Sequence, residues 1–367
     1  IHQLGAPGIQ FLPFEGLTIP FWIFVLTPDE ATGYTLAVLS SFAIAAWGSY
    51  LLLFFMFGNR WAALFGGITF AFSGFNVAWA HWPHLSTASL IPWVLASQLR
   101  YWQTGMTRWA LAFAVSVALL SVGGFPFVTL VGVIAGIILG AVLLVADWNL
   151  RRFVGLLVAG LAGASLTLPA IYQFAEFLQQ TNLSYRTGGT GLRLDDLSHL
   201  IGVDVGTRIS VERTFFAGTL AAVFSVASYF LVLFRPNRYA IFGALVAFFV
   251  LCTAYGLAPA FLVEKIPGFS MNPWSRSGVL VGLSFAVLSA YFLSHLLRGS
   301  WLHKNWLITS IVLAAVFGIQ TWQLHQQFTL YNSRPSKETY FPPTPTLSYI
   351  SQHLLPFQSA VADASFV

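Results

Sequence analysis

Long apolar runs separated by short charged gaps most strongly limit how this chain can fold. Crossing about 30 Å of hydrocarbon takes roughly 20 apolar residues in a helix. Only 8% of the residues are charged, against about 25% in an ordinary soluble domain. The sequence therefore predicts an all-α polytopic membrane protein. The runs predict ten spanning helices, near residues 31–57, 61–79, 86–102, 108–122, 126–146, 152–172, 214–234, 239–257, 277–297 and 305–324.

The charged gaps alternate in character along the chain. Every second gap is basic, and these gaps contain Arg60, Arg100, Arg108, Arg151, Arg152, Arg235, Arg238, Arg298 and Lys304. Asp147 is the one acid among them, and all other acids lie in the intervening gaps or near the two ends. Because cytoplasmic loops carry an excess of Lys and Arg, we expect the basic gaps to face the cytoplasm. Both ends of the chain and the chemically varied gaps are then extracytoplasmic.

Composition excludes several functional classes. The net charge of +5 and the pI near 9.4 do not indicate a nucleic-acid partner, because most cations are explained by topology and none form a dense cluster. The single Cys252 excludes a disulfide within the chain and a multi-cysteine metal site. The sequence contains no phosphate-binding P-loop, dinucleotide fingerprint or nucleophile elbow.

Three regions are predicted along the chain. They are an extracytoplasmic or interfacial segment at 1–30, a transmembrane domain at 31–324 with outer loops 173–213 and 258–276, and an extracytoplasmic linker at 325–367 that begins a C-terminal soluble domain. Short interfacial helices are expected in the outer loops. Because the chain opens at Ile1 without an initiator Met and stops inside this last region, we expect it to be a fragment of a longer protein.

Four local patterns have structural interpretations. Thr27-Pro28-Asp29-Glu30 is typical of a helix N-terminus and predicts the start of the first span. Gly66-Gly67 permits close helix packing. Gly123-Gly124-Phe125-Pro126 predicts a tight outer turn, and the isolated His295 is expected to be a packed or interfacial histidine.

The first candidate site is the pair His81 and His84, which flank Pro83 at the predicted outer mouth between two short spans. Interrupted segments of this kind often border a cavity. We expect the two imidazoles to hydrogen-bond a phosphate or a sugar. Two histidines are too few for a zinc site, and the structural alternative is a pair of interfacial histidines bonded to backbone.

The second candidate site is the long outer loop, which mixes acids that could activate a hydroxyl with cations that could hold a phosphate. Its members are Glu176, Arg186, Arg193, Asp195, Asp196, His199, Asp204, Arg208, Glu212 and Arg213. The alternative is an amphipathic helix with solvated charges. The third candidate is Arg276, just ahead of the ninth predicted span, which could contact a substrate phosphate or simply reach the lipid headgroups.

A series of short motifs runs through the chain in a fixed order. They are Ala71-Phe72-Ser73-Gly74-Phe75, Trp82-Pro83-His84, Ile91-Pro92-Trp93, Leu168-Pro169-Ala170, Ser184-Tyr185-Arg186, Pro267-Gly268-Phe269 and Tyr340-Phe341-Pro342-Pro343-Thr344-Pro345. In this order the chain resembles the YfhO-type bacterial membrane proteins over nearly its whole length.

The resemblance implies a GT-C-like fold and a glycosyltransferase of the bacterial cytoplasmic membrane. Such an enzyme moves a sugar from a polyprenyl-phosphate donor to an extracytoplasmic acceptor, a cell-envelope glycan or lipid. The implied catalytic carboxylate lies upstream of Gly5-Ala6-Pro7, outside this chain, and Glu15, Asp29 and Glu30 do not match its motif. No cofactor is expected, and a divalent metal stays open. The residues expected to bind the substrate are His81, His84, Glu176, Arg186 and Arg276.

Two other functional classes stay open. The protein could be a non-catalytic membrane subunit that keeps a GT-C-like scaffold and assembles with other membrane subunits. A transporter or flippase of lipid-linked precursors is less favoured, because it would show internal repeats or ionisable residues in the middle of spans. The predicted spans here are almost free of such residues.

Overall fold

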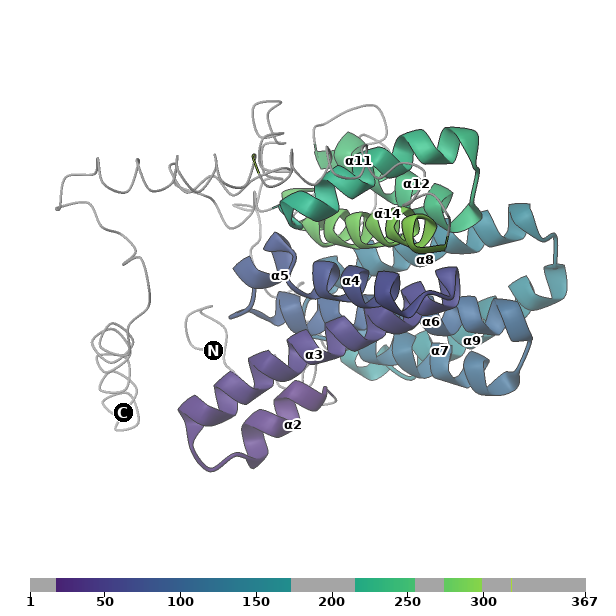
Figure 1. Cartoon of the computed structure of the whole chain (residues 1–367). Coiled ribbons are helices and arrows are strands. Elements are labelled where there is room, and N and C mark those ends of the chain that lie inside the picture. The colour runs from purple at the N-terminus through teal and green to yellow at the C-terminus, as the bar shows by residue number, and fades with distance from the viewer. Residues whose placement is uncertain (1–17, 173–214, 255–273, 299–317, 319–367) are drawn as a thin grey trace, which may run out of the picture. The chain divides into compact units, whose positions relative to one another are not determined.

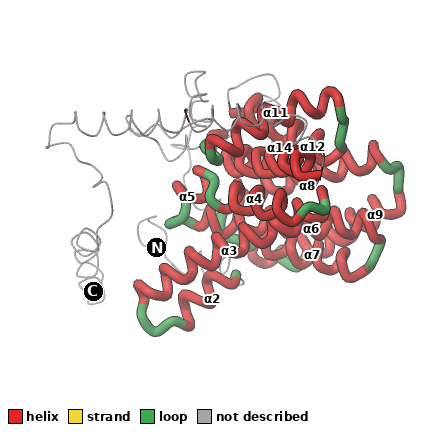
Figure 2. The backbone as a smooth tube through the Cα atoms, viewed as in Figure 1, coloured by secondary structure: helices red, strands yellow, loops and turns green. Residues whose placement is uncertain are grey.

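The computed structural model describes residues 18–172, 215–254, 274–298 and Gly318 (Figure 1). Within these ranges the chain is helical and contains no strand, which confirms the all-α prediction (Figure 2). The chain divides into two units, Ile1–Gln320 and Thr321–Val367, and every described residue belongs to the first. The predicted outer loop at 173–213 and the predicted linker at 325–367 lie outside the described residues, as does the last predicted span apart from Gly318.

The predicted spans in the described ranges fall on helices, although the span at 61–79 is broken into two helices and the helix within 152–172 ends at Ser165. The elements are α2 (Ile19–Leu26), α3 (Glu30–Phe57), α4 (Arg60–Ala71), α5 (Gly74–Ala78), α6 (Pro83–Thr104), α7 (Thr107–Ser121), α8 (Pro126–Ala146), α9 (Leu150–Ser165), α11 (Thr219–Phe234), α12 (Arg238–Ala254), the 3₁₀ helix η5 (Trp274–Ser277) and α14 (Gly278–Arg298). Among the described residues, four segments are long and apolar enough to cross a membrane: α3, α4 with α5, α8 and α14. Their length and composition are those of helices that cross a membrane. The total of ten spans stays a prediction.

Helix α14 forms the centre of the bundle. It packs against α4, α11 and α12, and 83% of its most apolar window is buried. The close approach of α4 depends on Gly66, as the sequence predicts, because an added Cβ there would overlap Leu53 Cδ1 and lie 2.8 Å from the carbonyl oxygen of Ala286. Ser225 and Ser228 of α11 donate hydrogen bonds to backbone carbonyls of α14. Small residues and hydroxyls thus hold these helices together, as is usual in membrane bundles.

Tight turns and caps set the helix boundaries. The carboxylate of Asp29 accepts a hydrogen bond of 2.7 Å from the amide of Thr32, which confirms the predicted start of α3. Gly58 ends α3 in the left-handed region, with φ of 65°, where glycine carries no steric penalty. Asn59 then caps α4. Two antiparallel helices are thereby joined by only two residues.

The basic gaps of the sequence gather at one end of the bundle, which we call the basic end. Arg298 at the end of α14 lies against Gly58 in the α3–α4 turn. Arg238 of α12 forms an ion pair with Asp147 at the end of α8. Arg152 of α9 donates to a backbone carbonyl near the end of α6. In Figure 1 the α8–α9 turn marks this end at the right, and α5 lies at the opposite end. The alternation of charges along the sequence predicts this grouping.

Candidate functional site

The end of the bundle opposite the basic end carries a buried polar and aromatic cluster. It is built from the break between α4 and α5, the first turn of α6, the turn before α8 and the η5 segment before α14. The amide of Gly74 donates to the carbonyl of Phe216, which joins α5 to the segment leading into α11. Gly282 of α14 lets Ser73 approach closely, since an added Cβ would lie 2.8 Å from its side chain.

His84 lies at the centre of this cluster and is only 4% exposed. Its ring is stacked between two aromatic rings, with centroid separations of 3.9 Å to Trp79 and 3.5 Å to Phe125. Phe75 lies at the edge of the same group. We call the three stacked residues, Trp79, His84 and Phe125, the ring stack.

The tight turn before α8 delivers Phe125 to the ring stack. Gly124 has φ of 101°, a conformation that favours glycine. A Cβ at Gly123 would lie 2.9 Å from the backbone of Thr87, so only glycine fits there. The Thr87 hydroxyl accepts a 3.1 Å hydrogen bond from the amide of Phe125 and donates to the carbonyl of Pro83. The predicted turn is confirmed, but its sequence gave no signal that Phe125 belongs to the site.

Arg276 places a positive charge against the ring stack. Its guanidinium carbon lies 5.5 Å from the ring centroid of Trp79 and 5.7 Å from that of Phe125, within the usual range of cation–π contacts. Two of the residues expected to bind substrate, His84 and Arg276, are therefore brought to the same pair of aromatic rings. They are far apart in the sequence, and the fold alone joins them.

The buried position of His84 favours the neutral form of its imidazole. It lies in the first turn of α6, ahead of the predicted span at 86–102. Burial lowers the pKa of His84 well below its ordinary value, and the charge of Arg276 lowers this pKa further. A neutral imidazole can donate a hydrogen bond from one ring nitrogen and accept one at the other.

His81 has different surroundings from His84. Its side chain is exposed, and its Nδ1 lies 3.0 Å from the hydroxyl of Tyr34 near the start of α3. The two rings stack with centroids 5.9 Å apart. The two histidines therefore contact different groups. The other expected binding residues, Glu176 and Arg186, lie outside the described residues.

Several buried polar atoms of the cluster have no hydrogen-bond partner within the described part of the chain. They are both ring nitrogens of His84, Trp79 Nε1, Ser73 Oγ and Asn76 Oδ1. A buried polar group without a partner costs about 1–3 kcal/mol, so such a concentration favours a polar ligand or water at this place. Over the same ranges, no group of three His, Cys, Asp or Glu residues is arranged to hold a metal ion.

Asn76 supports the break between α4 and α5. It is fully buried, and its amide donates a 2.8 Å hydrogen bond to the carbonyl of Phe70 in the last turn of α4. Replacing Asn76 with alanine should lower the free energy of unfolding by about 1 kcal/mol, because the Phe70 carbonyl loses its side-chain donor and keeps the amide of Ser73. Thermal unfolding in detergent would measure the change. Ser73→Ala is the matched control, since the Ser73 hydroxyl has no partner among the described residues; equal losses in both variants would contradict this role.

The lowered pKa of His84 predicts a dependence of stability on pH. The unfolded chain binds a proton at this histidine below about pH 6.5, whereas the folded protein does not. The contribution of His84 to the free energy of unfolding is therefore fully present above pH 6.5 and decreases as the pH falls below that value. We expect the melting temperature to fall between pH 7.5 and 5.5, and His84→Phe to flatten that dependence. An identical slope in the parent and the variant would show that His84 is not held neutral.

No protein-family model and no curated protein matches the chain, so these comparisons assign it to no family.

Proposed function

We propose that the protein is a membrane glycosyltransferase of the GT-C type, with ten spanning helices in this chain. It transfers a sugar from a polyprenyl-phosphate donor to a cell-envelope acceptor on the extracytoplasmic side of the bacterial cytoplasmic membrane. The observation that carries the proposal is the ring stack with Arg276 against it and unpartnered polar atoms around it. The resemblance to the YfhO-type proteins supplies the reaction class.

The chemistry of the cluster suits a phosphate-linked sugar. An arginine guanidinium presents donors in a planar fork that matches phosphate oxygens. The neutral imidazole of His84 can donate a hydrogen bond to the same group or to a sugar hydroxyl. The partly exposed ring of Phe125 offers an apolar surface to the sugar. We assign binding and orientation of the donor headgroup to this cluster, with Glu176 and Arg186 of the outer loop as further contacts.

The transfer step requires a base and a charge-stabilising group. The acceptor oxygen forms a bond to the anomeric carbon of the sugar as the bond from that carbon to the phosphate oxygen breaks. A carboxylate takes the acceptor proton, and Arg276 stabilises the charge that grows on the leaving phosphate. The resemblance implies that this carboxylate lies upstream of Gly5-Ala6-Pro7.

The charge distribution supports the orientation. Arginines concentrate at the basic end, and such an excess is typical of the cytoplasmic side. The ring stack at the opposite end then lies at the outer surface. Membrane lipids surround the bundle, and the donor approaches from the membrane.

The second candidate is a non-catalytic subunit of a larger membrane complex. The observation that favours it is the position of the acids among the described residues, which are Asp29, Glu30 and Asp147. Asp29 caps α3, Glu30 is exposed, and Asp147 pairs with Arg238 at the basic end. These positions place none of the three described acids in the ring stack.

A sugar-transfer assay distinguishes the two candidates. The full-length protein in nanodiscs is supplied with radiolabelled polyprenyl-phosphate sugars and a cell-envelope extract as acceptor. Incorporation of label that depends on the protein establishes the enzyme. A folded preparation that transfers no label from any donor, and that co-purifies with other membrane subunits, would establish the structural candidate instead.

A further inference from the structure

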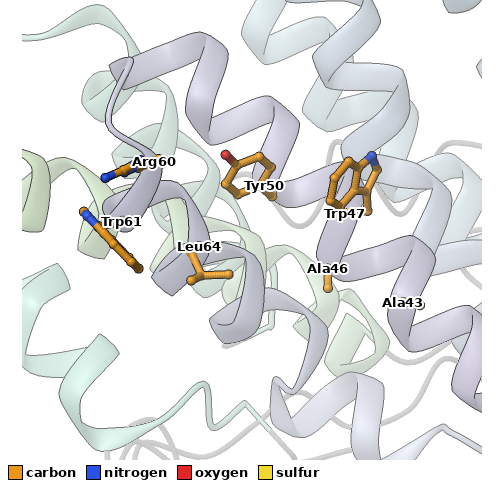
Figure 3. Close-up of a pocket in the computed structure, with 7 residues that line it drawn as sticks. All are labelled: Ala43, Ala46, Trp47, Tyr50, Arg60, Trp61 and Leu64. Atoms are coloured by element: carbon orange, nitrogen blue, oxygen red, sulfur yellow. The ribbon is translucent and has the colours of Figure 1, made fainter.

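A groove between α3 and α4 is separate from the ring stack. Its volume is about 540 Å³. Figure 3 shows Arg60 and Trp61 toward one end and Trp47 toward the other, with Tyr50 between them. The lining residues are Ala43, Ala46, Trp47, Tyr50, Arg60, Trp61 and Leu64.

The groove is apolar along its length and positively charged at one end. Trp47 and Trp61 are each more than half exposed, at 59% and 58%, and Leu64 is 44% exposed. Arg60 is its one charged lining residue, and the guanidinium lies 5.2 Å from the ring centroid of Trp61. The ion pair found in the described ranges joins Arg238 to Asp147 and does not involve Arg60.

Further positive charge lies close to the same end. Arg298 contacts Gly58, two residues before Arg60, in the α3–α4 turn. This turn belongs to the basic end, where Asp147 is the one acid in the described ranges. An anion seated on Arg60 therefore meets no carboxylate in the turn.

We propose that this groove binds an anionic phospholipid of the surrounding membrane. Its phosphate lies on Arg60, and the upper part of one acyl chain runs along Trp61, Leu64, Tyr50 and Trp47. The walls of the groove are two of the segments that can span a membrane, so its apolar part faces hydrocarbon. From Ala43 to Tyr50 the groove extends about 10 Å along α3, at 1.5 Å per residue, which matches part of an acyl chain.

The charge and the aromatic residues favour this occupant over others. A zwitterionic lipid brings a cationic group beside its phosphate and no net negative charge to Arg60, and a soluble anion would leave the tryptophans exposed. Only the Arg60 end of the groove lies at the basic end, and the groove shares no lining residue with the ring stack. The proposal therefore stands or falls independently of the proposed function.

Native mass spectrometry of the full chain, released from micelles, tests the proposal. Phosphatidylglycerol and phosphatidylcholine with the same acyl chains are added in turn. We expect the parent to retain phosphatidylglycerol more strongly, and Arg60→Gln to weaken that binding about five-fold, since one arginine near a membrane surface is worth about that factor. Ala43→Leu, at an exposed position of α3, should reduce retention of both lipids by filling the groove.

Arg108→Gln is the matched control, because Arg108 is another exposed arginine in a predicted basic gap and does not line the groove. It should bind phosphatidylglycerol as the parent does, and equal melting temperatures show that each variant is folded. Three results would overturn the proposal. They are equal retention of the two lipids by the parent, undiminished phosphatidylglycerol binding in folded Arg60→Gln, or a dimer peak that Ala43→Leu abolishes, which would assign the groove to a second copy of the chain.

Discussion

Replacing Arg276 with glutamine is expected to lower sugar transfer about 10- to 100-fold while the protein stays folded. A hydrogen bond to a charged group contributes about 1.5–3 kcal/mol. The variant loses this stabilisation of the leaving phosphate as negative charge develops on it. Glutamine removes the positive charge that lies over Trp79 and Phe125 but keeps a side chain of moderate size. The initial rate of label transfer in nanodiscs, with saturating donor and with limiting donor, separates a loss of binding from a loss of turnover.

The same assay on His84→Phe separates chemistry from packing. Phenylalanine preserves three stacked rings but removes both ring nitrogens, which have no partner among the described residues. We expect transfer to fall in the same direction as for Arg276→Gln. Arg108→Gln should transfer at the parent rate, because Arg108 contacts Trp109 and takes no part in the cluster. Full activity in both Arg276→Gln and His84→Phe would remove the cluster from the donor site.

Replacing Gly66 with valine is expected to have the largest effect on stability. The first added carbon already overlaps Leu53 Cδ1 and lies 2.8 Å from the carbonyl oxygen of Ala286, which is backbone and cannot rotate away. Overpacking in a tight core costs about 1–3 kcal/mol, and valine adds two further carbons. We therefore expect a loss near the upper end of that range, about 3 kcal/mol, measured as unfolding in detergent followed by circular dichroism.

Gly136→Ala is the matched control for Gly66. Gly136 is also a helical glycine within a candidate span, but an added Cβ there would lie 3.5 Å from Gln98 Oε1, an ordinary contact. The free energy of unfolding of this variant should be close to that of the parent. If Gly66→Val and Gly136→Ala lost the same stability, the close crossing of α4 and α14 would not limit the packing of the bundle.

The helices were predictable because their signal is local. A run of apolar residues specifies a helix without reference to the rest of the chain, and a cap such as Asp29 specifies where it begins. The gathering of arginines at the basic end follows from their alternation along the sequence. The break between α4 and α5 at Ser73 falls inside the predicted span at 61–79 and was not predicted.

The site was predictable only in its parts. His81 and His84 are three residues apart, a spacing that on one helix would place them on one face. Helix α6 begins at Pro83, so His81 lies outside it and turns to Tyr34. Phe125 was missed because nothing local connects it to His84. Its place depends on Thr87, which holds the turn before α8 against α6, and that contact belongs to tertiary structure.

The central position of α14 has a consequence for biosynthesis. This helix is the last of the described helices to leave the ribosome, yet it fills the middle of the bundle. Its backbone carbonyls accept hydrogen bonds from the hydroxyls of Ser225 and Ser228. Earlier helices must therefore wait in the membrane with glycine and serine surfaces uncovered until residue 298 is inserted. A nascent chain arrested before Gly278 lacks this core and leaves those surfaces without their partner helix.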